Sequence, residues 1–242
     1  MAKTKIEWCD QTINPVIGCS KCSPGCENCY AEKFAARLAR NGKLGLRALD
    51  YQVAVENGEW SGKVVFDLKC FDKLPKRPAT VFLASMGDVF HENVPFHHIA
   101  ALWRKMAEYP QHRFLVLTKR AERMEELLGY LRQKWARTIS ENPRLELANV
   151  WLGVTVCNQA EADEKVAHLL ATPAAGRFIS VEPMLGPTDL WSPKFKTYGN
   201  PGLTGAITGW AGSGLEWVIC GGETGGQAPP GVADRVTGCG VR

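Results

Sequence analysis

The chain has 242 residues, of which 45% are hydrophobic and 22% are charged. This length and composition are typical of one globular domain with a substantial core, and they exclude a disordered chain, a collagen-like repeat and a short disulfide scaffold. The net charge of +4 is concentrated in residues 1–120, which hold 18 Lys and Arg against 12 Asp and Glu, a bias compatible with an anionic ligand such as nucleic acid or with an ordinary solvated surface.

The start of the chain and its apolar runs bear on localisation. The first residues, MAKTKIEWCD, have no apolar core of the kind that a signal peptide needs. No apolar run approaches the roughly 18 to 20 residues of a membrane-spanning helix. We therefore expect a cytoplasmic protein without membrane contact.

Short apolar runs rich in Val, Ile and Phe alternate along the chain with segments of helical periodicity. A first strand is expected within residues 6–17, and the further predicted strands are 64–67, 80–86, 113–118, 149–156, 177–182 and 216–220. The predicted helices are 30–41, 96–109, 121–133 and 159–171. Almost continuously apolar strands that alternate with helices indicate a parallel sheet with both faces covered. Seven such strands favour an α/β fold with a closed or partial, TIM-like (β/α) barrel over an open doubly wound sheet.

The first predicted helix, 30–41, carries large apolar residues on one side. Tyr30, Phe34 and Leu38 recur at a spacing of four residues, which places them on one helix face. We expect this stripe to be the buried face of the helix.

The predicted elements form a single domain over residues 1–225. Two stretches interrupt the alternation of strands and helices: 42–62, and the Gly-, Pro-, Ser- and Thr-rich 185–214, which predicts a long loop. Residues 226–242 show no helix or strand period. A barrel that ends there lacks the helix that would cover its last strand, so we expect an irregular and truncated or altered carboxyl-terminal tail.

Five of the nine cysteines lie within the first thirty residues. An odd number of cysteines in a reducing compartment argues against a disulfide framework and for metal or redox use. Cys22, Cys26 and Cys29 form a C-x3-C-x2-C motif between the first predicted strand and the first predicted helix. In a parallel barrel this is the carboxyl-end face, where functional residues collect, and Pro24-Gly25 allow the loop to wrap tightly enough for three thiolates to share one inorganic centre.

Three kinds of site compete for these thiols. Cys19 and Cys22 with Cys26 and Cys29 make two C-x2-C pairs suited to zinc, but structural zinc sites separate their pairs by roughly 12 to 20 residues, whereas three residues intervene here. An electron carrier would use all four thiolates to close an iron–sulfur cluster. Three closely spaced ligands with one iron left open favour a catalytic cluster, with Cys19 as an ordinary loop residue.

The cysteine motif and several further blocks resemble the radical S-adenosylmethionine (radical SAM) superfamily and, within it, a phage-associated branch of uncharacterised three-cysteine-motif proteins. The matching blocks are WCD (8–10), TINPVIGC (12–19), SPGCENCYAE (23–32), FLASMGDVFHENVP (82–95), LTKRAERM (117–124), NVWLGVTVCNQ (149–159), FISVEPMLGP (178–187) and WVICGGETG (217–225). The resemblance thus covers most of residues 6–225. It implies a barrel of the radical SAM type.

The resemblance also implies a chemistry. Cys22, Cys26 and Cys29 would ligate three irons of a 4Fe–4S cluster, and S-adenosyl-L-methionine would bind the fourth iron and be cleaved reductively to a 5′-deoxyadenosyl radical. The expected partners are an electron donor such as flavodoxin or ferredoxin, a nucleic acid or nucleotide substrate for modification or repair, and a partner protein encoded nearby. The alternative is a non-catalytic zinc-binding or iron–sulfur protein of phage origin.

Polar residues that end the predicted strands are the candidates for holding the cofactor. They are Ser85, Asp88, Thr118, Lys119, Thr155, Ser180 and Glu182. The ends of parallel strands face the same mouth, so these side chains should gather there, although each type is also common in turns and helix caps. Lys119 or its neighbour Arg120 suits a carboxylate, and Asp88 or Glu182 suits ribose hydroxyls.

Overall fold

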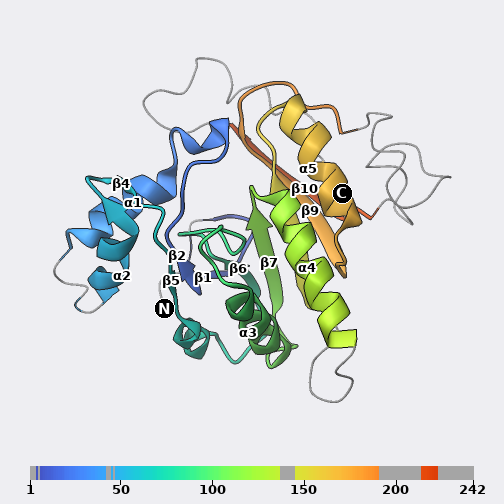
Figure 1. Ribbon diagram of the computed structural model, residues 1–242, viewed down its shortest axis with the longest axis horizontal. Coiled ribbons are helices and arrows are strands. Elements are labelled where there is room, and N and C mark those ends of the chain that lie inside the picture. The colour runs from blue at the N-terminus through green and yellow to red at the C-terminus, as the bar shows by residue number, and fades with distance from the viewer. Residues whose placement is uncertain are drawn as a thin grey trace.

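The computed structural model describes residues 4, 6–41, 45, 47–136, 145–190 and 214–222. Six parallel strands form one sheet that curves into a half-barrel, so the α/β class and the parallel arrangement predicted from the sequence are confirmed (Figure 1). In sheet order the strands are β1 (Gln11–Ile13), β6 (Thr80–Leu83), β7 (Arg113–Thr118), β8 (Val150–Thr155), β9 (Gly176–Met184) and β10 (Trp217–Gly222).

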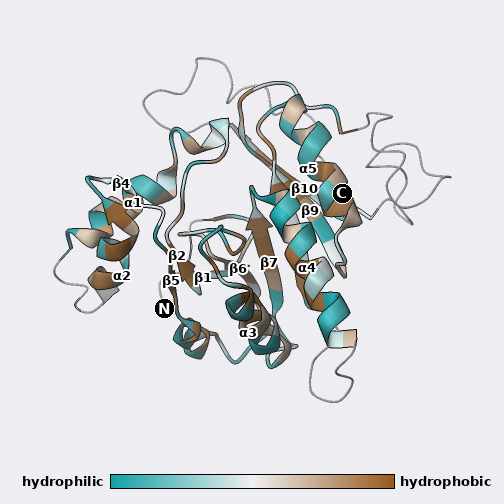
Figure 2. Cartoon of the chain, in the orientation of Figure 1, coloured by the Kyte–Doolittle hydropathy of each residue, from teal (hydrophilic) through white to brown (hydrophobic). Residues whose placement is uncertain are grey.

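Helices connect successive strands of the sheet and cover its outer face. They are α3 (Phe96–Ala107), α4 (Ala121–Ala136) and α5 (Gln159–Ala171), which follow β6, β7 and β8 (Figure 1). The core between sheet and helices is apolar and fully buried, with Trp103 of α3 and Phe114 of β7 among its largest side chains. Figure 2 shows the apolar strands beneath helices whose outer faces are polar.

The strand predicted at 64–67 lies outside the main sheet. There β5 (Val65–Phe66) pairs antiparallel with β2 (Val16–Ile17) in a separate two-stranded ladder. This pairing covers Val16 and Ile17, which are buried. Immediately after it, the 3-10 helix η3 (Leu68–Lys73) leads the chain into β6. The expectation of seven strands in the barrel was therefore wrong, and the described sheet has six.

The open side of the half-barrel is bridged by side chains. β1 and β10 are the two edge strands of the sheet. Trp8, just before β1, meets Trp217 of β10 edge to face, with ring centroids 6.3 Å apart. Trp8 also packs on Phe82 of β6 at 4.6 Å. The two edges therefore approach one another through aromatic contact rather than a backbone ladder.

A second group of elements stands beside the sheet. Its first helix lies within the helix predicted at 30–41, and its other elements lie in 42–62, where no element was predicted. We call it the α1–α2 lobe; it consists of α1 (Tyr30–Ala39), α2 (Arg47–Ala54), β3 (Val55–Glu56) and β4 (Glu59–Trp60). Figure 1 shows the lobe to one side of the sheet. Because α1 packs on α2 and the β3–β4 hairpin, its environment differs from that of the helices that cover the sheet.

The expected buried face of α1 was wrong. Tyr30 and Phe34 are 61% and 45% exposed, and the helix buries Ala31, Ala35 and Ala36 instead. Small side chains allow the closely packed elements of the lobe to approach α1, which leaves the aromatic side outward.

Some expectations lie outside the described residues. These are most of the predicted loop 185–214 and the whole tail 226–242. Residues 185–190 are described and form neither helix nor strand. In the part of the chain that the structure describes, no helix has the length and apolar character needed to cross a membrane.

Candidate functional site

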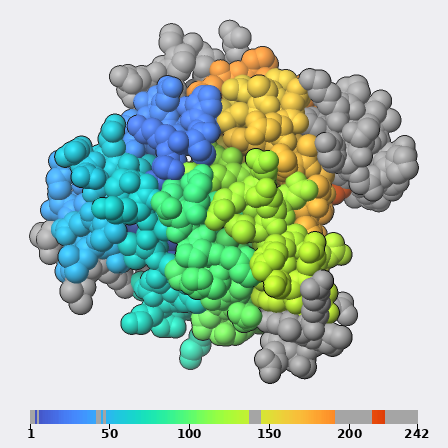
Figure 3. Space-filling model, viewed as in Figure 1, coloured from blue at the N-terminus to red at the C-terminus, as the bar shows by residue number. Residues whose placement is uncertain are grey.

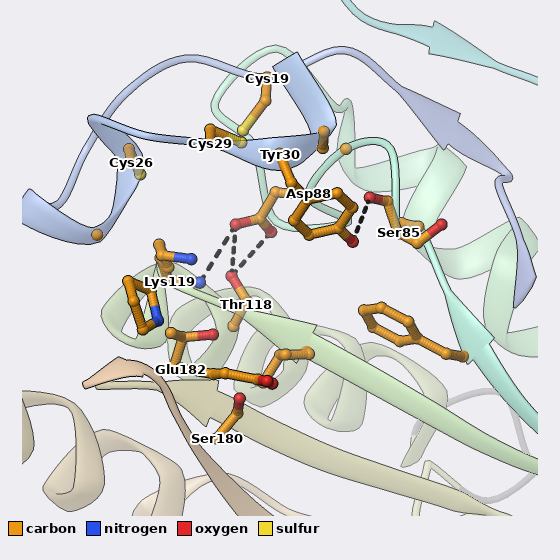
Figure 4. A pocket seen from close by; sticks show the side chains of 18 of the residues that line it. Cys19, Cys26, Cys29, Tyr30, Ser85, Asp88, Thr118, Lys119, Ser180 and Glu182 are labelled. Carbon is orange, nitrogen blue, oxygen red and sulfur yellow. Dashed lines mark hydrogen bonds between the residues drawn. The ribbon is translucent and has the colours of Figure 1, made fainter. Parts of the chain in front are cut away.

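A cavity of about 940 Å³ opens at the carboxyl ends of the strands. The three cysteines of the C-x3-C-x2-C motif and all seven predicted strand-end residues line it, most of them labelled in Figure 4. The strand-end residues are Ser85, Asp88, Thr118, Lys119, Thr155, Ser180 and Glu182. One cavity thus brings together side chains that are spread over 160 positions of the sequence, because parallel strands end at the same edge.

The cysteine loop, residues 18–29, forms one wall of the cavity. Gly18 begins it with φ at 108° and forms a parallel bridge to Gly87 beyond β6. The 3-10 helix η1 (Pro24–Cys26) turns the chain, and the Ser23 hydroxyl accepts a hydrogen bond from the Gly25 amide at 3.2 Å. Cys29 then precedes the first residue of α1. The loop therefore has a defined conformation at its beginning and a defined turn in its middle.

The three thiols of the motif differ in environment. Cys26 is buried, Cys29 is partly buried and Cys22 is exposed. A hydrogen bond from the Cys22 thiol lowers the pKa of Cys26 to about 5, and nearby Lys119 acts in the same direction. The same hydrogen bond raises the pKa of Cys22. Cys26 is thus the thiol of this pair that is favoured as a thiolate.

Cys19 lies apart from these contacts. Its thiol donates to the Ser20 carbonyl at 3.4 Å and accepts from Arg120 Nη1 at 3.7 Å. Burial raises its pKa to about 12, and Asp88 adds to the effect. Both contacts of the Cys19 sulfur are therefore with residues that line the cavity, Ser20 and Arg120.

A buried ion network fastens the beginning of the cysteine loop. Arg120 donates from Nη2 to the Ser20 hydroxyl at 2.8 Å and to the Ser20 carbonyl at 3.1 Å. Its Nη1 reaches Asp88 at 3.1 Å, and its Nε reaches Glu92 at 2.7 Å. His91 also contacts the Ser20 hydroxyl, at 2.9 Å. Arg120 is therefore committed to protein groups, which leaves Lys119 as the better candidate for a ligand carboxylate.

Asp88 is also hydrogen-bonded to Thr118. The Thr118 hydroxyl lies 2.8 and 2.9 Å from the two carboxylate oxygens of Asp88, and the Lys119 amide donates to Asp88 at 3.3 Å (Figure 4). Ser85 donates to Asn14 at 3.1 Å. These three predicted cofactor contacts thus have protein partners that a ligand would have to share.

A second buried pair fastens the middle of the loop. Lys165 and Glu161 of α5 lie 2.6 Å apart, and Glu161 accepts from the Cys157 amide at 2.8 Å. A hydrogen bond joins the side chain of Ser23 to Glu161. A Cβ at Gly25 would overlap the Cys157 sulfur, so the loop and this region are in close contact. Cys157 is fully buried, as expected for a small apolar side chain in the core.

The opposite wall, formed by β8 and β9, is less completely hydrogen-bonded. Ser180 is 1% exposed, and its hydroxyl oxygen has no hydrogen-bond partner among the described residues. Thr155 lies beside it in register on β8. Partial burial raises the pKa of Glu182, whereas a hydrogen bond from the Trp8 side chain acts in the opposite direction. The Glu182 side chain lines the cavity. A Cβ at Gly221 would overlap this carboxylate.

A site for a single metal ion is a separate possibility for the cysteine motif. Within the described ranges, no three His, Cys, Asp or Glu side chains are grouped to hold one metal ion. A cluster with several irons makes a different demand, because it binds each thiolate through a separate iron, so the sulfurs need not meet at one point.

Comparison with known proteins places the chain in a family. The model of a family described as a protein of unknown function, DUF5131, matches residues 3–237. The chain belongs to this family. No curated protein and no solved structure matches it.

In this DUF5131 protein, three aromatic residues of the cavity escaped the sequence analysis. Trp8, Tyr30 and Trp217 line it, and none of them was among the predicted site residues. The available signal was position: Tyr30 directly follows the last cysteine of the motif, and Trp8 and Trp217 open two of the matching blocks.

Proposed function

We propose that this DUF5131 protein is a radical SAM enzyme whose 4Fe–4S cluster is held by Cys22, Cys26 and Cys29, with S-adenosylmethionine bound beside it. The observation that carries the proposal is the shared cavity: three thiols from one loop face it together with the polar ends of four strand regions. Such convergence at the carboxyl ends of parallel strands is typical of barrel enzymes.

The residues fit the chemical demands of these groups. Thiolates suit iron, and the lowered pKa of Cys26 favours its ligating form. Ser180 offers an unpartnered hydroxyl, and the Lys119 ammonium makes no ion pair among the described residues. When bound, the cluster and S-adenosylmethionine would supply a 5′-deoxyadenosyl radical after one-electron reduction by a donor such as flavodoxin or ferredoxin.

The protein's own groups would orient the ligand and exclude water. Lys119 is the cation for a carboxylate, and the Ser180 and Thr155 hydroxyls can donate to polar atoms of the ligand. Trp8 and Trp217 are in ring contact and line the cavity, so their apolar surfaces would help to exclude water from a bound ligand. Arg120 holds the cysteine loop by its contacts with Ser20. In this proposal, residues of the barrel orient S-adenosylmethionine, and the cysteine loop supplies the ligands of the cluster.

The decisive test is anaerobic reconstitution of the full chain, followed by iron and zinc analysis and electron paramagnetic resonance of the reduced protein with and without S-adenosylmethionine. We expect about four irons per chain and a spectrum that changes on addition of the cofactor. Zinc without iron would favour the non-catalytic alternative. A cluster whose spectrum does not change when S-adenosylmethionine is added would favour an electron carrier.

Matched cysteine variants sharpen this test. Cys26→Ala should lose the cluster, because it removes one of three ligands, whereas Cys19→Ala should keep the iron content of the parent chain. Equal loss in both variants would contradict a three-ligand cluster and favour four thiolates.

A further inference from the structure

The outer face of α1 has an unusual composition for a solvent-facing helix surface. Tyr30 and Phe34, 61% and 45% exposed, are one helical turn apart and therefore lie on the same side. Neighbouring apolar side chains left in water more often mark a binding surface than isolated ones do. The alanine face of the same helix supplies its packing against the lobe, so the rings are not needed there.

The charges on this face are all positive. Lys33 and Arg37 are exposed beside the two rings, and the Arg37 guanidinium lies 6.0 Å from the centroid of Phe34. The one acid of α1, Glu32, is buried on the opposite side. There it accepts from the Trp60 amide at 2.9 Å and pairs with Lys21 at 3.4 Å. Rings and cations thus alternate without a neighbouring carboxylate from the helix itself.

This face is continuous with the cavity. Tyr30 lines the cavity and belongs to the outer face of α1, and its hydroxyl donates to the Ser85 carbonyl at 3.1 Å (Figure 4). Helix α1 begins directly after Cys29, so the surface starts at the cysteine loop. Figure 3 shows the blue and cyan elements of the lobe forming one side of the molecule, exposed to solvent.

We propose that the outer face of α1, defined by Tyr30, Lys33, Phe34 and Arg37, binds single-stranded nucleic acid and leads one nucleotide of the strand to the cavity. Unpaired bases stack on aromatic rings whatever their sequence, and phosphates pair with the cations between them. A duplex offers phosphates but keeps its bases stacked inside. The cavity, at about 940 Å³, is of the size that encloses small organic ligands.

Binding of the strand rests on the surface of α1 alone. The role of the strand as substrate rests on the proposed radical enzyme. A binding measurement therefore tests the inference separately from the function.

The experiment is fluorescence anisotropy of labelled, mixed-sequence single strands of about 20 nucleotides, as RNA and as DNA, with the full chain at about 50 and 200 mM salt. We expect saturable binding that weakens with salt, and the two strands identify the preferred nucleic acid. Phe34→Ala should weaken binding about fivefold or more, because a stacking ring is lost. Lys33→Gln with Arg37→Gln should lower the salt slope by about 1.4, because each lost phosphate contact of a single strand contributes about 0.7.

The chain offers a matched control on another helix. Tyr130 of α4 is also 45% exposed, and Lys134 lies 5.2 Å from its ring. Tyr130→Ala and Lys134→Gln should bind the strand as the parent chain does. All of these substitutions are at exposed positions, so unchanged thermal unfolding would verify that each variant is folded.

Several results would overturn the inference. They are absence of binding to both strands at low salt, equal affinity of Phe34→Ala and the parent chain, equal weakening by Tyr130→Ala, and equally tight binding of a duplex. Binding of an acidic peptide but of neither strand would likewise reject nucleic acid in favour of a protein partner. A chain that binds the strand but takes up no iron would retain this inference and remove the proposed function.

Discussion

The two walls of the cavity differ in how their polar groups are satisfied. On the cysteine-loop side, Asp88 and Arg120 are buried and form an ion pair, and Arg120 also donates a hydrogen bond to the Ser20 hydroxyl. On the strand side, the buried hydroxyl of Ser180 has no hydrogen-bond partner within the described part of the chain, and Glu182 is open to the cavity. A satisfied network resists rearrangement, whereas an unsatisfied buried group is costly unless something binds it. The loop wall is therefore organised for rigidity and the strand wall for a ligand.

The largest expected effect comes from breaking the loop wall. Arg120→Met should lower the free energy of unfolding by about 3–5 kcal/mol, because it leaves Asp88 buried without its cationic partner. Denaturant unfolding measures this. As a control, Lys105→Met breaks the more exposed pair with Glu108, at 2.7 Å, and should cost less than about 1 kcal/mol. Similar losses in both variants would contradict the special role of the network.

A smaller effect is expected where the loop touches the core. Gly25→Ala should cost about 1–3 kcal/mol, because its new methyl group overlaps the Cys157 sulfur. Cys157→Ala in the same chain removes that sulfur and should recover part of the loss. A double-mutant cycle by denaturant unfolding measures the coupling between the two positions. Additive effects would mean that the two sites do not touch in solution.

Removal of a hydroxyl should affect stability differently on the two walls. Thr118→Val removes a donor to Asp88 and should cost about 1–3 kcal/mol in unfolding free energy. Ser180→Ala removes an unpartnered hydroxyl and should change stability by less than about 0.5 kcal/mol. The same Ser180→Ala variant should weaken binding of S-adenosylmethionine in a calorimetric titration. Unaltered ligand affinity, or a large stability loss for Ser180→Ala, would remove the assignment of this wall to the ligand.

The smallest effect concerns pH. Burial lowers the pKa of His91 below its ordinary value of 6.5, and Arg120 adds to this shift. The folded chain therefore takes up this proton less readily than the unfolded chain, so the stability is complete above pH 6.5 and falls as the pH drops below it. His91→Asn should show a weaker loss between about pH 7.5 and pH 5 by urea unfolding. Parallel pH profiles for the two chains would exclude this contribution.

Much of the barrel could be predicted because its strands and helices carry strong periodic patterns. The prediction at 113–118 coincides with β7, and that at 159–171 coincides with α5. The run at 64–67 was wrongly placed in the main sheet, because a short apolar strand can pair equally well in a small separate ladder, as β5 does with β2. The site residues could be gathered from the sequence because each follows a strand, and parallel strand ends share one edge.

The lobe shows where sequence reasoning stops. The pattern of Tyr30, Phe34 and Leu38 is that of a buried helix face, yet α1 buries alanines and presents its aromatic rings to solvent. A helical pattern identifies two faces but does not identify the neighbour that each will meet. Here the neighbours are α2 and a short hairpin rather than the sheet.

The sequence by itself determined the α/β class, the order of parallel strands and helices, and the position of the three-cysteine motif before the first helix, because these follow from local periodicity and spacing. Only the tertiary structure decided which polar groups are already paired and which remain available. Arg120 and Lys119 are neighbours in the sequence, but one is fixed within a buried ion network and the other is without an ion pair among the described residues. That difference depends on contacts between segments up to a hundred residues apart, which no local pattern contains.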